Sequence, residues 1–203
     1  MSKIAFDIAL LLPEEIMDLA ISANKSVTDP RCVYRLNKTD VLPHITLVQG
    51  VLDEARFPEV AALLNDTAQT TLPLTLKITG LDSRVQDDGY PAIGFSIESD
   101  KKVLQLHETL MKQTEAILTS DATEEMFFDS PIRPGSVAWV QNYRAKHSHR
   151  SYHPHITISV GGVTNMDVQF PVSFTASRLA LCHLGNGNSC RKIFAEFTLT
   201  GTK

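Results

Sequence analysis

A short phrase occurs twice in this chain, and any fold has to accommodate both copies: Pro-His-Ile-Thr followed by an aliphatic residue. The first copy occupies residues 43–48 and the second residues 154–159, one in each half of the chain. Each copy is rich in β-branched residues, begins with proline and runs towards glycine, at Gly50 and at Gly161-Gly162. Apolar runs with ends of this kind predict two β-strands.

Side chains of a strand alternate between its two faces. His44 and Thr46 are therefore expected on one face of the first strand, with Ile45 and Leu47 on the other. In the second strand the same parity predicts His155, Thr157 and Ser159 on one face, and Ile156, Ile158 and Val160 on the opposite face. Each strand should have an apolar side for a core and a polar side that carries an imidazole and a hydroxyl.

These polar sides have the equipment for phosphoryl chemistry. An imidazole titrates near neutral pH, which suits it to give or take a proton. A threonine hydroxyl two residues along the same strand can donate a hydrogen bond to an oxyanion. Two such pairs facing one another across a groove supply a base, an acid and two donors around one tetrahedral centre. This set can promote in-line displacement at phosphorus without a metal.

A single His-x-Thr motif often occurs by chance, but the repetition of the whole phrase favours a functional interpretation. The chain resembles the two-histidine (2H) phosphoesterases, the superfamily of 2′-5′ RNA ligase-like proteins and cyclic nucleotide phosphodiesterases. The family signature of two His-x-Thr/Ser motifs is matched by His44 and Thr46 and by His155 and Thr157. The resemblance implies that these four residues are catalytic. It covers most of the chain, although the two motifs are further apart than in a minimal member, and the excess falls in residues 120–152.

The resemblance also implies an α+β fold of two pseudo-symmetric lobes. Each lobe is expected to be an antiparallel sheet with helices packed on its outer face, and the active-site groove lies between the lobes. We expect a single bilobal domain over residues 1–203, with lobe one at 1–98, lobe two at 99–203 and a long loop at 120–152. Besides the two histidine strands, the apolar patterns predict strands at 4–12, 72–81, 90–97, 172–184 and 192–199. Helices are predicted after Pro13, from Asp53 and over residues 101–118.

Composition narrows the class of protein. The 203 residues are 43% hydrophobic and 21% charged, which is ordinary for a globular protein. No apolar run is long enough to span a bilayer and no secretion signal is evident, so we expect a cytoplasmic protein without a membrane partner. A net charge of −4 argues against general nucleic-acid coating but leaves room for a local basic groove. Three cysteines without Cys-x-x-Cys spacing are expected to be reduced thiols.

Candidate substrate-binding residues precede each motif. Arg31, Tyr34 and Arg35 lie before the first copy and can line a phosphate-binding groove, while Tyr152 and His153 stand directly before the second. The 120–152 segment also interleaves aromatic residues with cations, a composition that suits a nucleotide or an RNA end. For its single tryptophan, Trp139, burial in a short strand around residues 137–140 is favoured over stacking on a base.

A metal site is the main rival. His147, His149, His153 and His155 are closely spaced, and imidazoles at such spacing can bind zinc, copper or nickel. This interpretation leaves His44 and Thr46 without a role, so we expect no metal and no cofactor. Neither a Walker loop nor a Gly-x-Gly-x-x-Gly fingerprint is present, so ATP-driven ligation has no support.

The sequence therefore predicts a metal-independent phosphodiesterase that hydrolyses a cyclic phosphodiester, either a 2′,3′-cyclic nucleotide or a cyclic RNA end. A binding module that holds an RNA end or a nucleotide without turnover, or a metal-dependent hydrolase using residues 147–155, are the alternatives. We expect a monomer without a stable protein partner. The exact substrate, and which histidine is the acid and which the base, stay open at this stage.

Overall fold

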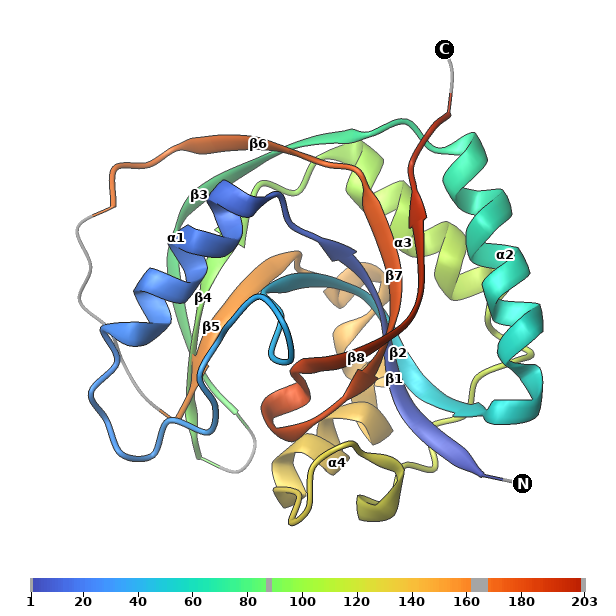
Figure 1. The fold of residues 1–203 in the computed structure, drawn as a ribbon, viewed down its shortest axis with the longest axis horizontal. Coiled ribbons are helices and arrows are strands. Elements are labelled where there is room, and N and C mark those ends of the chain that lie inside the picture. Colours follow the sequence, from blue (N-terminus) through green and yellow to red (C-terminus); the bar gives the residue numbers. More distant parts are fainter. Residues whose placement is uncertain (1, 87–88, 162–167, 202–203) are drawn as a thin grey trace.

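The computed structural model describes residues 2–86, 89–161 and 168–201, and over these it is an α+β fold (Figure 1). Its strands are β1 (Lys3–Leu11), β2 (His44–Asp53), β3 (Leu74–Val85), β4 (Pro91–Ile97), β5 (His155–Val160), β6 (Val172–Ala176), β7 (Arg178–Leu184) and β8 (Cys190–Thr198). Its α-helices are α1 (Glu14–Lys25), α2 (Phe57–Thr70), α3 (Lys101–Gln113) and α4 (Pro134–Asn142). Short helical turns cover Glu54–Arg56, Glu124–Met126, Tyr143–His147, His149–Ser151 and Asn186–Asn188.

All the strands belong to one curled antiparallel sheet in the order β6-β3-β4-β5-β2-β1-β7-β8. The two histidine strands, β5 and β2, are neighbours at its centre and pair at Ile45 and Ile156. Four strands lie to each side of this junction, counting β5 and β2 themselves. The expected pseudo-symmetry is therefore present as two four-stranded halves joined along the histidine strands.

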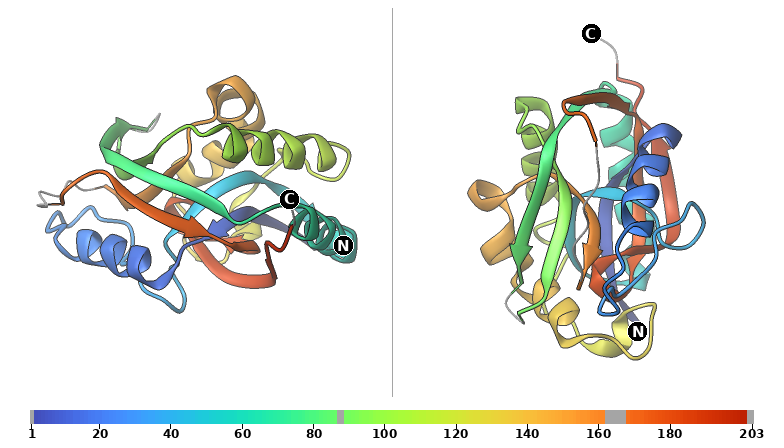
Figure 2. Two further views of the ribbon diagram at one scale, coloured as in Figure 1. Left: turned by 90° about the horizontal axis from the view of Figure 1, so that it is seen from above. Right: turned by 90° about the vertical axis from the view of Figure 1, so that its left-hand side faces the viewer.

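Helices cover both sides of this sheet. Helix α1 contacts β5, α2 contacts β7 and β8, and α3 and α4 contact β2. Viewed from above, α1 and α3 lie on opposite sides of the strands (Figure 2). Strand β1 is buried over almost its whole length because it is covered on both faces, which explains its near-continuous apolar sequence. Within it Asp7 is a fully buried carboxylate. No helix in the described parts of the chain is long and apolar enough to cross a bilayer.

The division of the chain at residue 98 does not follow the sheet. Strands β3 and β4 from the first half pair with β6 and β5 from the second, while β1 pairs with β7. The strand predicted at 172–184 is in fact two strands, β6 on one edge and β7 beside β1 near the other. The apolar pattern continues across Ser177, but the pairing partner changes there, and a sequence pattern does not report the partner.

The segment 120–152 is largely helical rather than a loop. Trp139 lies in α4, which begins at Pro134, so the predicted strand around it is wrong. Proline fits the first turn of a helix, where its missing N–H has no intrahelical partner. The helix predicted over 101–118 ends at Gln113, where the Thr114 hydroxyl donates to Leu110 O. Strand β3 runs to Val85, beyond its predicted end. Gly162, at the predicted glycine end of the second histidine strand, lies outside the described residues.

Candidate functional site

Each histidine strand contains a β-bulge at the residue after its threonine. The ladder between β1 and β2 skips Leu47, and the ladder between β4 and β5 skips Ile158. These are equivalent positions in the two copies of the repeated phrase. A bulge adds one residue to one strand, so it shifts the alternation of faces by one position. The side-chain parity of both strands therefore changes after the threonine.

The consequence is a matched set of residues that line one cavity, namely His44, Thr46 and Gln49 from β2 and His155, Thr157 and Val160 from β5. The prediction for the start of each strand is confirmed, because Ile45 and Ile156 are fully buried. For the second strand, the prediction that Ser159 lies on the polar face and Val160 on the opposite one is wrong. Val160 lines the cavity, whereas Ser159 Oγ lies 3.5 Å from Cys32 Sγ. The bulge at Ile158 is the physical reason.

The carbonyl of each bulge residue is held by side chains. Leu47 O accepts hydrogen bonds from His107 Nδ1 at 2.6 Å and from the Tyr143 hydroxyl at 3.0 Å. Ile158 O accepts from Asn24 Nδ2 at 2.8 Å. Such buried carbonyls would be costly if left without donors. The histidine strands are therefore anchored at the same point by donors from α3, from the 143–147 turn and from α1.

The two catalytic candidates have the same local geometry. His44 Nδ1 donates to Leu42 O and His155 Nδ1 donates to His153 O, both at 2.8 Å. In each case a proline separates the carbonyl from the histidine, and it favours an extended backbone at the residue before it. With Nδ1–H fixed in this way, Nε2 is the nitrogen that can exchange a proton. The repeated Pro-His therefore sets the ring tautomer as well as the position.

The surroundings of the two Nε2 atoms differ. The buried Asp7 Oδ2 lies 3.6 Å from His44 Nε2 as an ion pair. The same oxygen accepts hydrogen bonds from Thr46 Oγ1 at 2.6 Å and from Gln49 Nε2 at 2.7 Å. On the other strand, Arg84 from β3 lines the cavity close enough to act electrostatically on His155. Arg84 is itself ion-paired with Asp82, which also lines the cavity and opposes the effect of Arg84 on the pKa of His155. His44 therefore lies beside a buried carboxylate, whereas His155 lies near the Arg84–Asp82 ion pair.

These charges move the two pKa values in opposite directions. Burial lowers the pKa of His44, but the hydrogen bond and charge of Asp7 outweigh it, so the net shift is upward from 6.5. Burial and then the positive charges of Arg84 and His44 lower the pKa of His155 to about 4. At neutral pH His155 is therefore a neutral imidazole, and His44 is the ring that holds a proton more readily.

The threonines also differ. The hydroxyl proton of Thr46 is committed to Asp7. Across the described part of the chain, the Thr157 hydroxyl has no hydrogen-bond partner, and it lines the cavity. A hydroxyl has a single proton to donate. Thr157 is accordingly ready to donate to a ligand, whereas Thr46 connects the carboxylate to its strand.

The cavity has a volume of about 200 Å³. Its other walls come from the ends of β3 and β4, from the 120–152 segment and from the turn at Gly187 and Asn188. Trp139 lines the cavity and stacks on His147, with ring centroids 3.8 Å apart. Tyr152 stacks on His107 at 3.7 Å and donates its hydroxyl to Thr46 O. His153 also lines the cavity. The structure thus brings Tyr152 and His153 to the site, as the sequence predicts. Trp139 is half-buried against the core and its ring stacks on His147, so it is both a core contact and part of the cavity wall.

The candidates before the first motif are not in this cavity. Arg31 forms an exposed ion pair with Asp29. Arg35 Nη1 donates to the carbonyls of α1 and the turn after it. Tyr34 is half-buried under Gly187, and its burial raises its pKa above the usual range. These three side chains have structural contacts instead of lining the groove, so we do not include them in the site.

Asp7, Gln49 and Arg84 are the site residues that sequence reasoning missed. Asp7 is a charge inside an otherwise apolar strand, which is a usable signal, because a fully buried carboxylate needs partners. Gln49 reaches the site only because of the bulge. Arg84 reaches it only because β3 extends past its predicted end.

The closely spaced histidines 147–155 do not converge. His147 stacks on Trp139, and His149 Nδ1 pairs with Glu108 on α3. Among the described residues, the one group of three or more His, Cys, Asp or Glu with donor atoms close together is Asp7, His44 and Cys190. The metal site proposed for residues 147–155 therefore has no geometric support.

Comparison with known proteins agrees with this arrangement. The family model described as the 2′-5′ RNA ligase superfamily matches residues 22–188. No curated protein matches the chain. Similar solved structures include TT0787 of Thermus thermophilus, with a TM-score of 0.63 and 18% identity over 98% of this chain and 100% of that one. Escherichia coli LigT in its apo form has a TM-score of 0.59 and 18% identity over 98% and 99%.

LigT complexed with 3′-AMP is also similar, with a TM-score of 0.55 and 16% identity over 96% of this chain and 97% of that one. At such identities the likeness concerns the fold. The family model covers most of the chain and both His-x-Thr motifs. The chain therefore belongs to the 2′-5′ RNA ligase superfamily, in which a phosphoesterase-type activity is expected.

Proposed function

We propose that the protein is a metal-independent phosphodiesterase that hydrolyses a cyclic phosphodiester, either a 2′,3′-cyclic nucleotide or the cyclic end of an RNA. The observation that carries the proposal is the pair of His-x-Thr strands lining one cavity, with a buried carboxylate beside His44 and a buried, neutral ring at His155. A base and an acid that act on the two sides of one phosphorus need rings whose pKa values are pushed apart in this way.

The charges support one assignment of roles. His155 Nε2, near Arg84, is the base that takes a proton from water as the water oxygen bonds to phosphorus. His44 Nε2, beside Asp7, is the acid that gives its proton to the ribose oxygen as the bond from phosphorus to that oxygen breaks. The product is a nucleoside phosphate monoester. The proton gained by His155 and the proton lost by His44 are then exchanged with solvent.

Two further groups act on the charge that builds up at phosphorus. The Thr157 hydroxyl donates to a non-bridging oxygen, and the Arg84 guanidinium, whose Nε is paired with Asp82, offers its terminal N–H groups in the same cavity. Thr46 has a different task, because its proton goes to Asp7. It positions the carboxylate that keeps His44 protonated.

An aromatic side chain favours a nucleotide as the substrate. The half-buried Trp139 lines the cavity, and base stacking on such a side chain is tolerant of sequence. Tyr152 lines the same cavity but is buried and stacked on His107, so it supports the wall. Solved LigT structures contain phosphate or 3′-AMP, and this fold likeness is consistent with a ligand of the same chemistry.

The test is hydrolysis of 2′,3′-cyclic nucleotides in EDTA, with identification of the product. We expect turnover by the wild type and a loss of at least about 10²-fold in kcat for His44→Ala and for His155→Ala. His149→Ala is the matched control, since its half-exposed ring belongs to the same histidine-rich segment but contacts Glu108 outside the cavity. It should retain activity.

Other outcomes point to the alternatives. Turnover that EDTA abolishes and that zinc or manganese restores, with loss in His149→Ala, would support a metal hydrolase using residues 147–155. Equal nucleotide binding by the wild type and by the His44→Ala/His155→Ala double variant, with no turnover by either, would support a binding module.

A further inference from the structure

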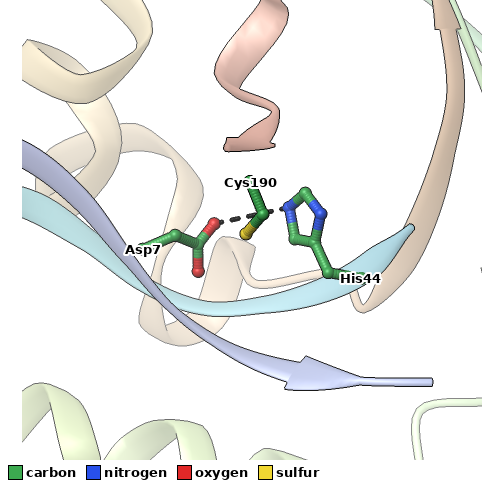
Figure 3. A group of neighbouring side chains, drawn as sticks. All are labelled: Asp7, His44 and Cys190. Carbon is green, nitrogen blue, oxygen red and sulfur yellow. Dashed lines mark ion pairs between the residues drawn. The ribbon is translucent and has the colours of Figure 1, made fainter. Parts of the chain in front are cut away.

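Asp7, His44 and Cys190 form a compact cluster beside the cavity, and they come from three different strands, β1, β2 and β8. Their carboxylate oxygen, imidazole nitrogen and thiol sulfur all lie within 4.8 Å of one another. In Figure 3 the three side chains point toward a common centre. The backbone bridge between Leu42 and Cys190 brings the start of β8 to the histidine strand. This contact joins residues that are far apart in the sequence.

The spacing suits a tetrahedral cation. Zinc binds carboxylate oxygen and imidazole nitrogen at about 2.0–2.2 Å, so two such ligands at the tetrahedral angle are about 3.4 Å apart. Asp7 Oδ2 and His44 Nε2 are already 3.6 Å apart. A thiolate completes a mixed oxygen, nitrogen and sulfur set, in which the thiolate and the imidazole favour zinc over magnesium or calcium. The Cys190 sulfur lies within 4.8 Å of the other two atoms and would have to approach them to about 3.6 Å.

The side chains of the cluster are also oriented by hydrogen bonds to groups outside it. The Nδ1–H of His44 is fixed on Leu42 O, which leaves Nε2 for a metal. Thr46 and Gln49 hold the Asp7 carboxylate, while Asp7 Oδ1 has no donor among the described residues. Histidine and carboxylate ligands in metal sites are oriented by outer hydrogen bonds of this kind.

Charge favours a dication over other occupants. Asp7 and Cys190 are fully buried. A carboxylate and a thiolate together neutralise a divalent cation, so the occupied cluster carries no net charge into the protein interior. The thiol proton is released when the metal binds.

We propose that Asp7, His44 and Cys190 form a binding site for a soft divalent cation such as Zn²⁺, and that occupation of this site inhibits the enzyme. The ion takes the Nε2 lone pair, so His44 can no longer carry the proton for the leaving oxygen. Only the inhibition rests on the proposed function; the binding does not. EDTA then acts as an activator, which is the opposite of its effect on a metal hydrolase.

The binding is tested with Co²⁺, whose bond to a thiolate gives a charge-transfer absorption band. We expect the metal-free wild type to develop this band on titration with Co²⁺ and to lose it when Zn²⁺ displaces the cobalt. Cys190→Ser should lack the band. Cys32→Ser is the matched control, because Cys32 contacts Asn24 and Ser159 instead of the cluster, and it should keep the band.

A second variant tests the carboxylate ligand independently of the thiol. Asp7→Asn keeps the volume but removes the carboxylate, and it should weaken Co²⁺ binding by at least about tenfold. Absence of the band in the wild type, or its persistence in Cys190→Ser, would overturn the site.

The inhibition is measured separately, as activity with Zn²⁺ relative to activity in EDTA for each variant. Cys190→Ser should need at least about tenfold more Zn²⁺ than Cys32→Ser for half inhibition. A Co²⁺ band without any turnover in EDTA would contradict the proposed function but support the metal site. Turnover in EDTA without the Co²⁺ band would support the proposed function and overturn the metal site.

Discussion

At the residue scale, the two histidines have the same backbone setting and different electrostatic partners. Both rings donate Nδ1–H to the carbonyl two residues earlier. Only His44 has a carboxylate within ion-pair distance, at 3.6 Å, among the residues that the structure describes. An identical backbone geometry, with a carboxylate from the described residues in ion-pair distance of only one of the two rings, gives two copies of one motif separate chemical roles.

This division of roles predicts the effect of the leaving group. A phosphodiester that releases nitrophenolate needs no proton at the departing oxygen, so it bypasses the acid. With this substrate the kcat/KM of His44→Ala and of Asp7→Asn should lie within about tenfold of the wild-type value, while the kcat/KM of His155→Ala stays low. The measurement is kcat/KM for both substrates. If the kcat/KM of His155→Ala recovers instead of that of His44→Ala, then His155 is the acid and His44 the base.

The threonines should be unequal as well. Thr157→Val removes a hydroxyl that is ready to donate to the substrate, and it should lower kcat by about 10²-fold. Thr46→Val removes a hydrogen bond to Asp7, and its effect on kcat should be clearly smaller. Steady-state kinetics of the two isosteric variants compares them directly. Equal losses would contradict the asymmetry.

At the scale of elements, the bulges at Leu47 and Ile158 determine which side chains reach the cavity. Strand β2 is supported there by His107 of α3. Its Nε2 accepts a hydrogen bond from His149 N at 2.9 Å, so the ring is neutral with the proton on Nδ1, which donates to Leu47 O. A second proton on this ring would break the Nε2 contact.

This tautomer predicts a pH-dependent stability. Burial lowers the pKa of His107 from 6.5, with a smaller contribution from His149, while Leu47 O and Glu108 oppose the shift. Because the unfolded chain binds this proton more readily, the free energy of unfolding should fall as the pH drops below about 6.5. His107→Gln, which keeps a donor and an acceptor, should lose this part of the pH dependence.

Urea unfolding of both proteins between pH 5 and 8 measures the difference. The wild type retains other buried titratable groups, such as His183, so the comparison of slopes is the readout. Parallel curves for the two proteins would contradict the neutral assignment.

At the scale of the whole molecule, the sheet is assembled from interleaved parts of the chain. Strand β1 lies between β2 and β7, and β4 lies between β3 and β5. Each four-stranded half therefore contains strands from before and after residue 98. The two histidine strands lie where these two halves meet.

This topology predicts that residues 1–98 do not fold alone. The fragment leaves β1 without β7 and β4 without β5, which exposes buried apolar faces and unpaired strand edges. We expect no cooperative thermal transition by circular dichroism for the fragment, in contrast to the full chain. A cooperative transition would show that the first half is an independent lobe after all.

The sequence by itself determined the two histidine strands, their tautomer-setting prolines, the α+β class and the family. These follow from patterns within a few residues, such as the alternation of Ile45 and Thr46 on a strand. Tertiary structure decided which residues complete the site. Asp7, Arg84 and Cys190 join it through strand neighbours and registers that depend on contacts across the whole chain. Gln49 and Val160 reach the site because of the two bulges. A bulge is defined by the pairing with a partner strand, so no local sequence pattern predicts it.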